Sequence, residues 1–126
     1  MAYEGSCLCG KVKISASVTV ESISACHCTT CTRWSSGPYF GLYGEAVEIS
    51  GEEFIKEFPS SEFAVRGFCQ DCGTHLYMKD LSSGSYGLSA GIFNTEKLPL
   101  IPNEYYLKSK PSYYKLADVT NSFDTY

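Results

Sequence analysis

Seven cysteines are the residues of this 126-residue chain whose type and spacing can do chemistry. They form two pairs and a triplet, which are Cys7 and Cys9, Cys69 and Cys72, and Cys26, Cys28 and Cys31. An odd count leaves one thiol over in a fully paired disulfide framework. Residues 1–5 also lack the basic start and apolar run of a secretory signal. We therefore expect a cytoplasmic protein with reduced thiols, in which metal ligation is the leading role for these cysteines.

The two cysteine pairs predict one closed zinc site. Two closely spaced thiolates can reach the same ion from a single turn, and a tetrahedral zinc commonly joins two such turns that are distant in sequence. Gly10 and Gly73 follow the pairs, as tight turns often require a residue that can take positive φ. Such a site contributes on the order of 10 kcal/mol of apparent folding free energy, so its role is structural. Its predicted ligands are Cys7, Cys9, Cys69 and Cys72.

The triplet predicts a second zinc site with an open position. Cys26, Cys28 and Cys31 supply three ligands, and three protein ligands with an exchangeable fourth are the usual layout of a catalytic zinc. Three thiolates make the ion a poor Lewis acid for ionising water, but they suit a soft fourth ligand. The sequence thus predicts two Zn²⁺ per chain, one structural and one labile. The labile site would hold a small-molecule thiol as a thiolate that adds to a carbonyl carbon.

Other interpretations of the triplet stay open. His27 or an acidic side chain would close the second site and make it structural, or the three cysteines would be redox-sensitive thiols. His27 is a weak ligand candidate, because in an extended Cys-His-Cys segment its side chain points away from its neighbours'. The open site could also bind a thiol or metal without turnover, as a carrier. A scaffold with two structural zincs is the third class of function.

Charge and hydropathy exclude several partners. The formal net charge is −4 and the pI is about 5.1, whereas nucleic-acid binders concentrate Lys and Arg. Two zinc ions on seven thiolates would make the charge more negative still, at about −7. No stretch approaches the roughly 20 apolar residues that span a bilayer. We expect neither a nucleic-acid nor a membrane partner, and the sequence does not specify the oligomeric state.

Short aromatic or β-branched segments, separated by Gly, Pro and Ser, predict antiparallel strands. Residues 11–18 show the clearest alternation of apolar and polar side chains. We expect further strands at residues 39–43, 47–49, 54–58, 63–66, 75–78, 86–92 and 105–107. A turn is predicted at residues 81–85, and one or two helical turns between Cys28 and Trp34. Without repeats or linkers, residues 1–126 are expected to form a single, mainly β domain.

The cysteine motifs resemble those of the glutathione-dependent formaldehyde-activating enzyme family, which includes the centromere protein V relatives. The order and spacing match at residues 5–10, 26–31 and 68–76, and the resemblance continues through residues 33–38, 91–94 and 105–114. It implies an antiparallel, tent-like β fold with zinc at the same two sets of cysteines. The implied activity is the addition of glutathione to formaldehyde, and its formal class is a carbon–sulfur lyase.

The chain departs from this family pattern at several positions. Thr32 stands where relatives commonly carry a basic residue or Gln, Ser36 where Gly is common, and Asn94 where Asp is common. Lys108 and Ser109 stand where an acidic-basic pair is frequent. The loss of a basic residue at position 32 weakens the case for anion binding beside the open zinc.

Arg33 is the nearest remaining cation in sequence to the triplet. Because glutathione carries two carboxylates, Arg33 is the candidate contact for that ligand; the alternative is a solvated surface arginine. Trp34 and the tyrosines of residues 105–114 are expected to pack against the core and the sheet. Lys56 and Arg66 are expected to face solvent on their strands, without a role.

Overall fold

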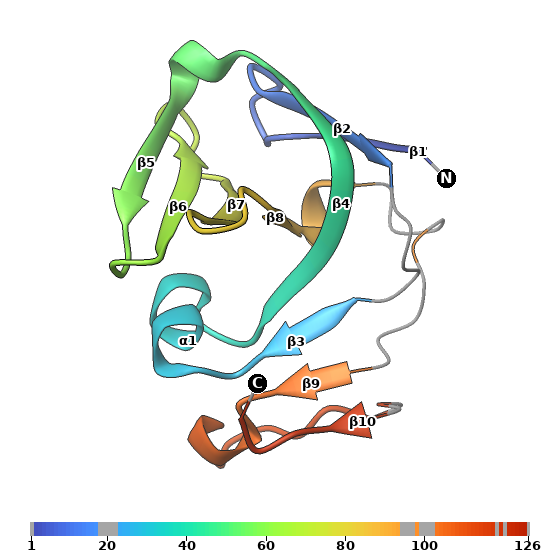
Figure 1. Ribbon diagram of the computed structural model, residues 1–126, viewed down its shortest axis with the longest axis vertical. Helices are drawn as coiled ribbons and strands as arrows, with labels where there is room; N and C mark the ends of the chain where they lie inside the picture. The colour runs from blue at the N-terminus through green and yellow to red at the C-terminus, as the bar shows by residue number, and fades with distance from the viewer. Residues whose placement is uncertain are drawn as a thin grey trace.

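The computed structural model describes residues 2–17, 23–93, 98, 103–117, 119 and 121–125. Within them the chain has the predicted mainly β fold, in which ten strands belong to one open sheet (Figure 1). The strands are β1 (Ala2–Ser6), β2 (Lys13–Ser17), β3 (Ser24–Cys26), β4 (Tyr39–Ser50), β5 (Ile55–Pro59), β6 (Ala64–Cys69), β7 (His75–Asp80), β8 (Tyr86–Ser89), β9 (Asn103–Tyr105) and β10 (Asn121–Ser122). The remaining described elements are the helix α1 (Thr29–Ser35) and the 3-10 turns η1 (Glu52–Phe54), η2 (Ala90–Ile92) and η4 (Leu107–Ser109).

The long strand β4 organises the sheet. It arches from the end of α1 to the loop that leads into β5 (Figure 1), pairing with β3 and β8 over its first part and with β2 over its last. We predicted two strands here, but β4 runs through Gly44, where a Cβ would come within 2.9 Å of the Ala16 Cβ. That glycine makes room for β2 and does not end the strand. Ala46 has a φ of 49° opposite a register shift in β2, so a bulge bends β4.

The core lies on the inner faces of these strands. Strands β1 and β2 form an antiparallel hairpin, and β5, β6, β7 and β8 follow one another as an antiparallel meander. Alternating side chains from β2, β4, β7 and β8 therefore meet in one apolar cluster. Its fully buried members include Val12, Ile14, Leu42, Cys69, Leu76 and Leu88.

The sheet is antiparallel as predicted except at one edge, where two strand pairs are parallel. Strand β9 pairs with β3 in parallel, and β10 pairs with β9 in parallel. The strand expected at residues 105–107 ends at Tyr105, because Tyr106 takes a left-handed conformation with φ of 57°. The strand expected at residues 86–92 ends at Ser89, where η2 begins. Val18 and Asn94 lie outside the described residues.

The predicted helical turns between Cys28 and Trp34 are confirmed as α1. Cys28 is its N-cap, and the Cys28 sulfur accepts a hydrogen bond from the Cys31 N–H at 3.3 Å. At the other end Ser36 adopts φ of 59°, and its N–H donates to the Thr32 carbonyl. This is the position at which glycine is favoured, because a residue without Cβ takes positive φ without strain.

None of the described helices is long and apolar enough to cross a membrane.

Candidate metal centres

The turns after β1 and β6 bring the two cysteine pairs together. The sulfurs of Cys7 and Cys9 are 3.5 Å apart, those of Cys9 and Cys69 are 3.8 Å apart, and all four, with Cys72, lie within 4.8 Å of one another. A tetrahedral zinc with Zn–S bonds of about 2.3 Å requires its sulfurs to be about 3.8 Å apart. The spacing and the all-sulfur donor set therefore fit one tetrahedral ion.

The surrounding groups favour thiolates at this four-cysteine site. The Val12 N–H donates to the Cys7 sulfur at 3.3 Å. Hydrogen bonds from the Thr74 side chain and backbone lower the pKa of Cys72 to about 5. Gly10 and Gly73 have φ of 81° and 78°, as the sequence predicts for these turns. Desolvation and the three neighbouring sulfurs raise the pKa of Cys9 to about 12, so that thiol needs the charge of a bound metal to lose its proton.

The three remaining cysteines gather at the start of α1. Cys26 ends β3, Cys28 caps the helix and Cys31 is buried in its first turn. Their sulfurs also lie within 4.8 Å of one another. Among the residues that the structure describes, no histidine or carboxylate joins either cysteine group. The triplet therefore offers three protein ligands and leaves a fourth position open.

His27 lies between two of these cysteines, but its ring is bonded elsewhere. The side chain is fully buried, with Nδ1 2.6 Å from the Tyr114 hydroxyl and Nε2 3.4 Å from a Glu104 carboxylate oxygen. The carboxylate also accepts a hydrogen bond from Ser122 at 3.0 Å. The ring thus points away from the sulfurs, as predicted for an extended Cys-His-Cys segment. Its two hydrogen bonds connect the cysteine segment to β9 and to Tyr114 near the C-terminus.

The close approach of the three sulfurs controls their protonation. Hydrogen bonds from Cys26 and then Cys31 lower the pKa of Cys28, while the interaction with Cys28 raises the pKa of Cys26. The first proton therefore leaves this cluster easily, and the accumulated negative charge resists the loss of the next. A cation must compensate that charge if all three cysteines are to act as thiolates.

Arg66 supplies one such cation, so the expectation that it faces solvent is wrong. Only 6% of its surface is exposed, and its Nη1 donates to the Cys31 sulfur at 3.4 Å. It reaches the site from β6, where a register shift against β7 follows at Gly67 and Phe68. Lys56, by contrast, is exposed on β5 as expected.

The open side of the triplet faces a cavity of about 340 Å³. Its wall contains the three cysteines together with the charged side chains of Arg66 and Asp80. Aromatic side chains make up much of the rest, including two from the C-terminal segment that we expected only to pack against the sheet. They are Tyr39, Tyr43, Phe63, Tyr105 and Tyr106. The cavity has room for a small thiol and an aldehyde beside the sulfurs.

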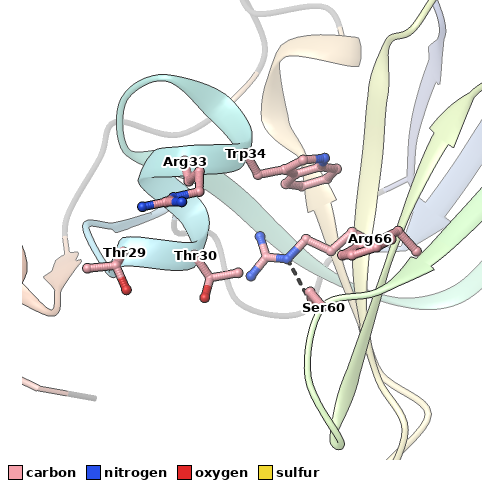
Figure 2. Close-up of a pocket in the computed structure, with 7 residues that line it drawn as sticks. Thr29, Thr30, Arg33, Trp34, Ser60 and Arg66 are labelled. Atoms are coloured by element: carbon pink, nitrogen blue, oxygen red, sulfur yellow. Dashed lines mark hydrogen bonds between the residues drawn. The ribbon is translucent and has the colours of Figure 1, made fainter.

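Arg33 lies in a neighbouring pocket of about 410 Å³ rather than in the cysteine cavity. Figure 2 shows Arg33 and Thr30 projecting from α1, while Arg66 reaches toward the helix from β6 and bonds Ser60. Arg33 is exposed, and Arg66 lines both pockets. Trp34 is half-buried on this rim and stacks on His75, in keeping with its predicted packing role.

Sequence reasoning missed Arg66 and Glu104 as parts of the site. Arg66 stands three residues before Cys69, and a charged residue within a strand indicates solvent exposure unless something covers that face. Here Cys31 and Trp34 of α1 contact the guanidinium, and the alternation of side chains along a strand cannot reveal such a tertiary contact. The useful signal was the proximity of Arg66 to a predicted ligand. Glu104 gave no local signal, because its contact with His27 spans 77 residues.

Three comparisons with known proteins agree with this geometry. Residues 2–109 match the model of the glutathione-dependent formaldehyde-activating enzyme family. An uncharacterized lyase of Schizosaccharomyces pombe is 32% identical over 123 residues, which cover 96% of this chain and 90% of the yeast protein. A crystal structure of a Rhodobacter sphaeroides protein is similar in fold, with a TM-score of 0.65 and 22% identity over 79% of this chain and 97% of that one.

The family match covers most of the chain, and its name indicates a formaldehyde-activating or lyase-type function. Both cysteine groups have the spacing of metal sites. The chain therefore belongs to the glutathione-dependent formaldehyde-activating enzyme family.

Proposed function

We propose that this protein adds a thiol such as glutathione to a small aldehyde such as formaldehyde, as a zinc-dependent carbon–sulfur lyase. The observation that carries the proposal is the three-cysteine group: its sulfurs converge within 4.8 Å beside a cavity, and no fourth protein ligand joins them among the described residues. We assign one structural zinc to the four-cysteine site and one labile zinc to Cys26, Cys28 and Cys31.

The reaction requires one bond to form and one proton to move. Cys26, Cys28 and Cys31 would hold the zinc ion, which would supply a soft site that favours the thiolate form of the incoming thiol. The sulfur then forms a bond to the aldehyde carbon, the carbon–oxygen π bond breaks, and the oxygen takes up one proton. The product is a hydroxymethyl thioether, and no oxidant or reductant is consumed.

The protein's own residues hold the reactants in place. The aromatic side chains in the wall of the 340 Å³ cavity would pack against the reactants beside the sulfurs. Thr32 stabilises the cysteine loop, because its hydroxyl donates to the His27 carbonyl at 3.3 Å. The main contribution of the chain is therefore positioning.

Arg33 remains our proposed contact for a carboxylate of glutathione. Its exposed guanidinium lies in the pocket next to the cysteine cavity, beside the Thr29 and Thr30 hydroxyls. A carboxylate is the natural partner for a guanidinium, because two N–H groups can bond its two oxygens at once. Glutathione should therefore bind more tightly than its diethyl ester, and Arg33→Gln should reduce that difference.

The test is the rate of S-hydroxymethylglutathione formation, measured by NMR exchange at equilibrium and compared with the uncatalysed exchange. The native protein is expected to raise this rate, and Cys28→Ser is expected to lose the increase while remaining folded. Glutathione binding without any increase in rate would rule out the enzyme and support the second candidate, a thiol carrier. The absence of a basic residue at position 32 is the observation that favours the carrier.

A further inference from the structure

The guanidinium of Arg66 is a buried cation without a carboxylate partner in the described part of the chain. Its exposed fraction is 6%, and the described ion pairs are those of Lys11 with Asp71 and His27 with Glu104. A buried charge without compensation is strongly destabilising. The surroundings of Arg66 must therefore supply negative charge from another source.

The contacts of the guanidinium show that source. Its Nη1 donates to the Cys31 sulfur at 3.4 Å and its Nε donates to the Ser60 hydroxyl at 3.2 Å. Its central carbon lies 5.0 Å from the centre of the Trp34 ring, within the range of a cation–π interaction. Ser60 and Trp34 thus fix the group in one orientation, with a donor aimed at a cysteine of the open site.

We propose that Arg66 is a positioning residue of the three-cysteine site, which compensates its negative charge and tightens its hold on a metal. Three thiolates around a divalent ion carry a net charge of about −1, and a fourth thiolate raises this to about −2. The guanidinium offsets part of that charge at a distance where no water intervenes. Its hydrogen bond also draws electron density from the Cys31 sulfur, which makes the metal more electrophilic toward an incoming thiol.

This inference rests on one part of the proposed function, the metal on the triplet. It does not require that the protein catalyses a reaction. The test is therefore a metal affinity. Zinc-loaded protein is titrated with a chromophoric chelator, and the four-cysteine site serves as the internal reference in each sample. We expect Arg66→Met to lower the zinc affinity of the three-cysteine site by roughly 10- to 100-fold, the usual effect of losing an outer-sphere partner. The four-cysteine site should keep its affinity.

Lys56→Met is the matched control, because it removes one positive charge from an exposed position on β5. It should leave both affinities unchanged. An unchanged three-cysteine site in Arg66→Met, or an equal loss in Lys56→Met, would overturn the proposal. Lost catalysis in Arg66→Met with normal zinc affinities would likewise overturn this role without counting against the proposed enzyme. A selective affinity loss in a protein whose native form does not accelerate the reaction would support this role and count against the enzyme alone.

Cobalt gives a second readout that a purely structural role would not change. The N–H···S bond stabilises the sulfur lone pair, so its loss should shift the sulfur-to-cobalt charge-transfer band of the open site to longer wavelength. If Arg66→Met does not fold, Arg66→Lys carries the test. Lysine keeps the positive charge but cannot donate to both Cys31 and Ser60 in the geometry of the guanidinium. We therefore expect the zinc affinity of the three-cysteine site to fall by about 3- to 10-fold. An unaltered affinity and spectrum in Arg66→Lys would then refute the proposal.

Discussion

The indole of Trp34 stacks on the imidazole of His75, with ring centroids 4.2 Å apart and planes inclined by 13°. This contact joins β7 to α1, the helix that contains Cys31 and has Cys28 as its N-cap. Burial of the ring, and then the nearby charge of Arg66, lower the pKa of His75 below its ordinary value. The stack therefore couples the packing of the helix to the protonation of one histidine.

The fluorescence of Trp34 should report the protonation of His75. The chain has one tryptophan, and a protonated imidazole in contact with an indole quenches its emission. Emission should fall on acidification with a midpoint below about 6.5, the ordinary value for histidine. In Arg66→Met the midpoint should rise, because a repelling cation has been removed. A quenching transition that persists in His75→Gln would contradict this assignment.

The same pKa shift makes a prediction for stability. The folded protein disfavours the protonated ring, so between its lowered pKa and about 6.5 the unfolded chain binds the proton more readily. The contribution of His75 to the free energy of unfolding is present above this window and is lost as pH falls through it. Urea titrations at a series of pH values should show that the free energy of unfolding declines less on acidification in His75→Gln than in the native protein.

The two cysteine groups should differ in what their loss does to the fold. Cys69 is fully buried and links β6 to the turn after β1, so Cys69→Ser should release the structural metal and unfold much of the sheet. Cys28→Ser should lose one metal but keep a cooperative thermal transition. Metal content and circular dichroism measured on the same samples distinguish these outcomes. Equal destabilisation by both variants would show that both sites are structural.

Ser36→Gly should stabilise the protein. Serine at φ of 59° is strained, and glycine relieves that strain at some cost in unfolded-state entropy. We expect a net gain of about 0.5–1 kcal/mol in the free energy of unfolding. The matched control, Ser35→Gly in the last turn of α1, should lose about 0.5 kcal/mol, because glycine is a poorer helix former than serine. Chemical denaturation of the two variants checks the opposite signs.

Tyr114→Phe should destabilise the loop that carries the open-site cysteines. It removes the hydroxyl 2.6 Å from Nδ1 of the fully buried His27 and leaves that nitrogen without its partner, at a cost of about 1–3 kcal/mol. The neighbouring Tyr113 is 73% exposed, so Tyr113→Phe should change stability by less than about 0.5 kcal/mol. Hydrogen exchange at residues 26–31 should accelerate in the first variant alone.

The grouping of the cysteines was predictable because it depends on local spacing and on the geometry of one ion. Cys7 and Cys9 share a turn, as do Cys69 and Cys72, and the structure brings these two pairs together. The helix after Cys28 was predictable for a similar reason, since its cap and first turn lie within a few residues. Local chemistry therefore determined the parts of the candidate site that hold the sulfurs.

The environment of the sulfurs was not predictable in the same way. The Arg66 guanidinium is buried where it meets Cys31 and Trp34 of α1. His27 meets Glu104 where β9 pairs with β3 in parallel. Parallel pairing brings together segments that are distant in sequence, and a three-residue strand such as β3 carries no periodic signal. These contacts depend on tertiary structure, which alternation along the chain does not encode.

The anchoring of His27 by later residues has a consequence for synthesis on the ribosome. The four-cysteine site uses no described residue beyond the turn that ends at Thr74, so its ligands can meet while the rest of the chain is still being made. The partners of His27, in contrast, are Glu104 and Tyr114, near the end of the chain. We therefore expect the four-cysteine ligands to meet first in a nascent chain, and the triplet to reach its final shape only when translation is nearly complete. Until then His27 lacks its hydrogen bonds to Glu104 and Tyr114, and we expect Cys26, Cys28 and Cys31 to be more accessible to oxidants.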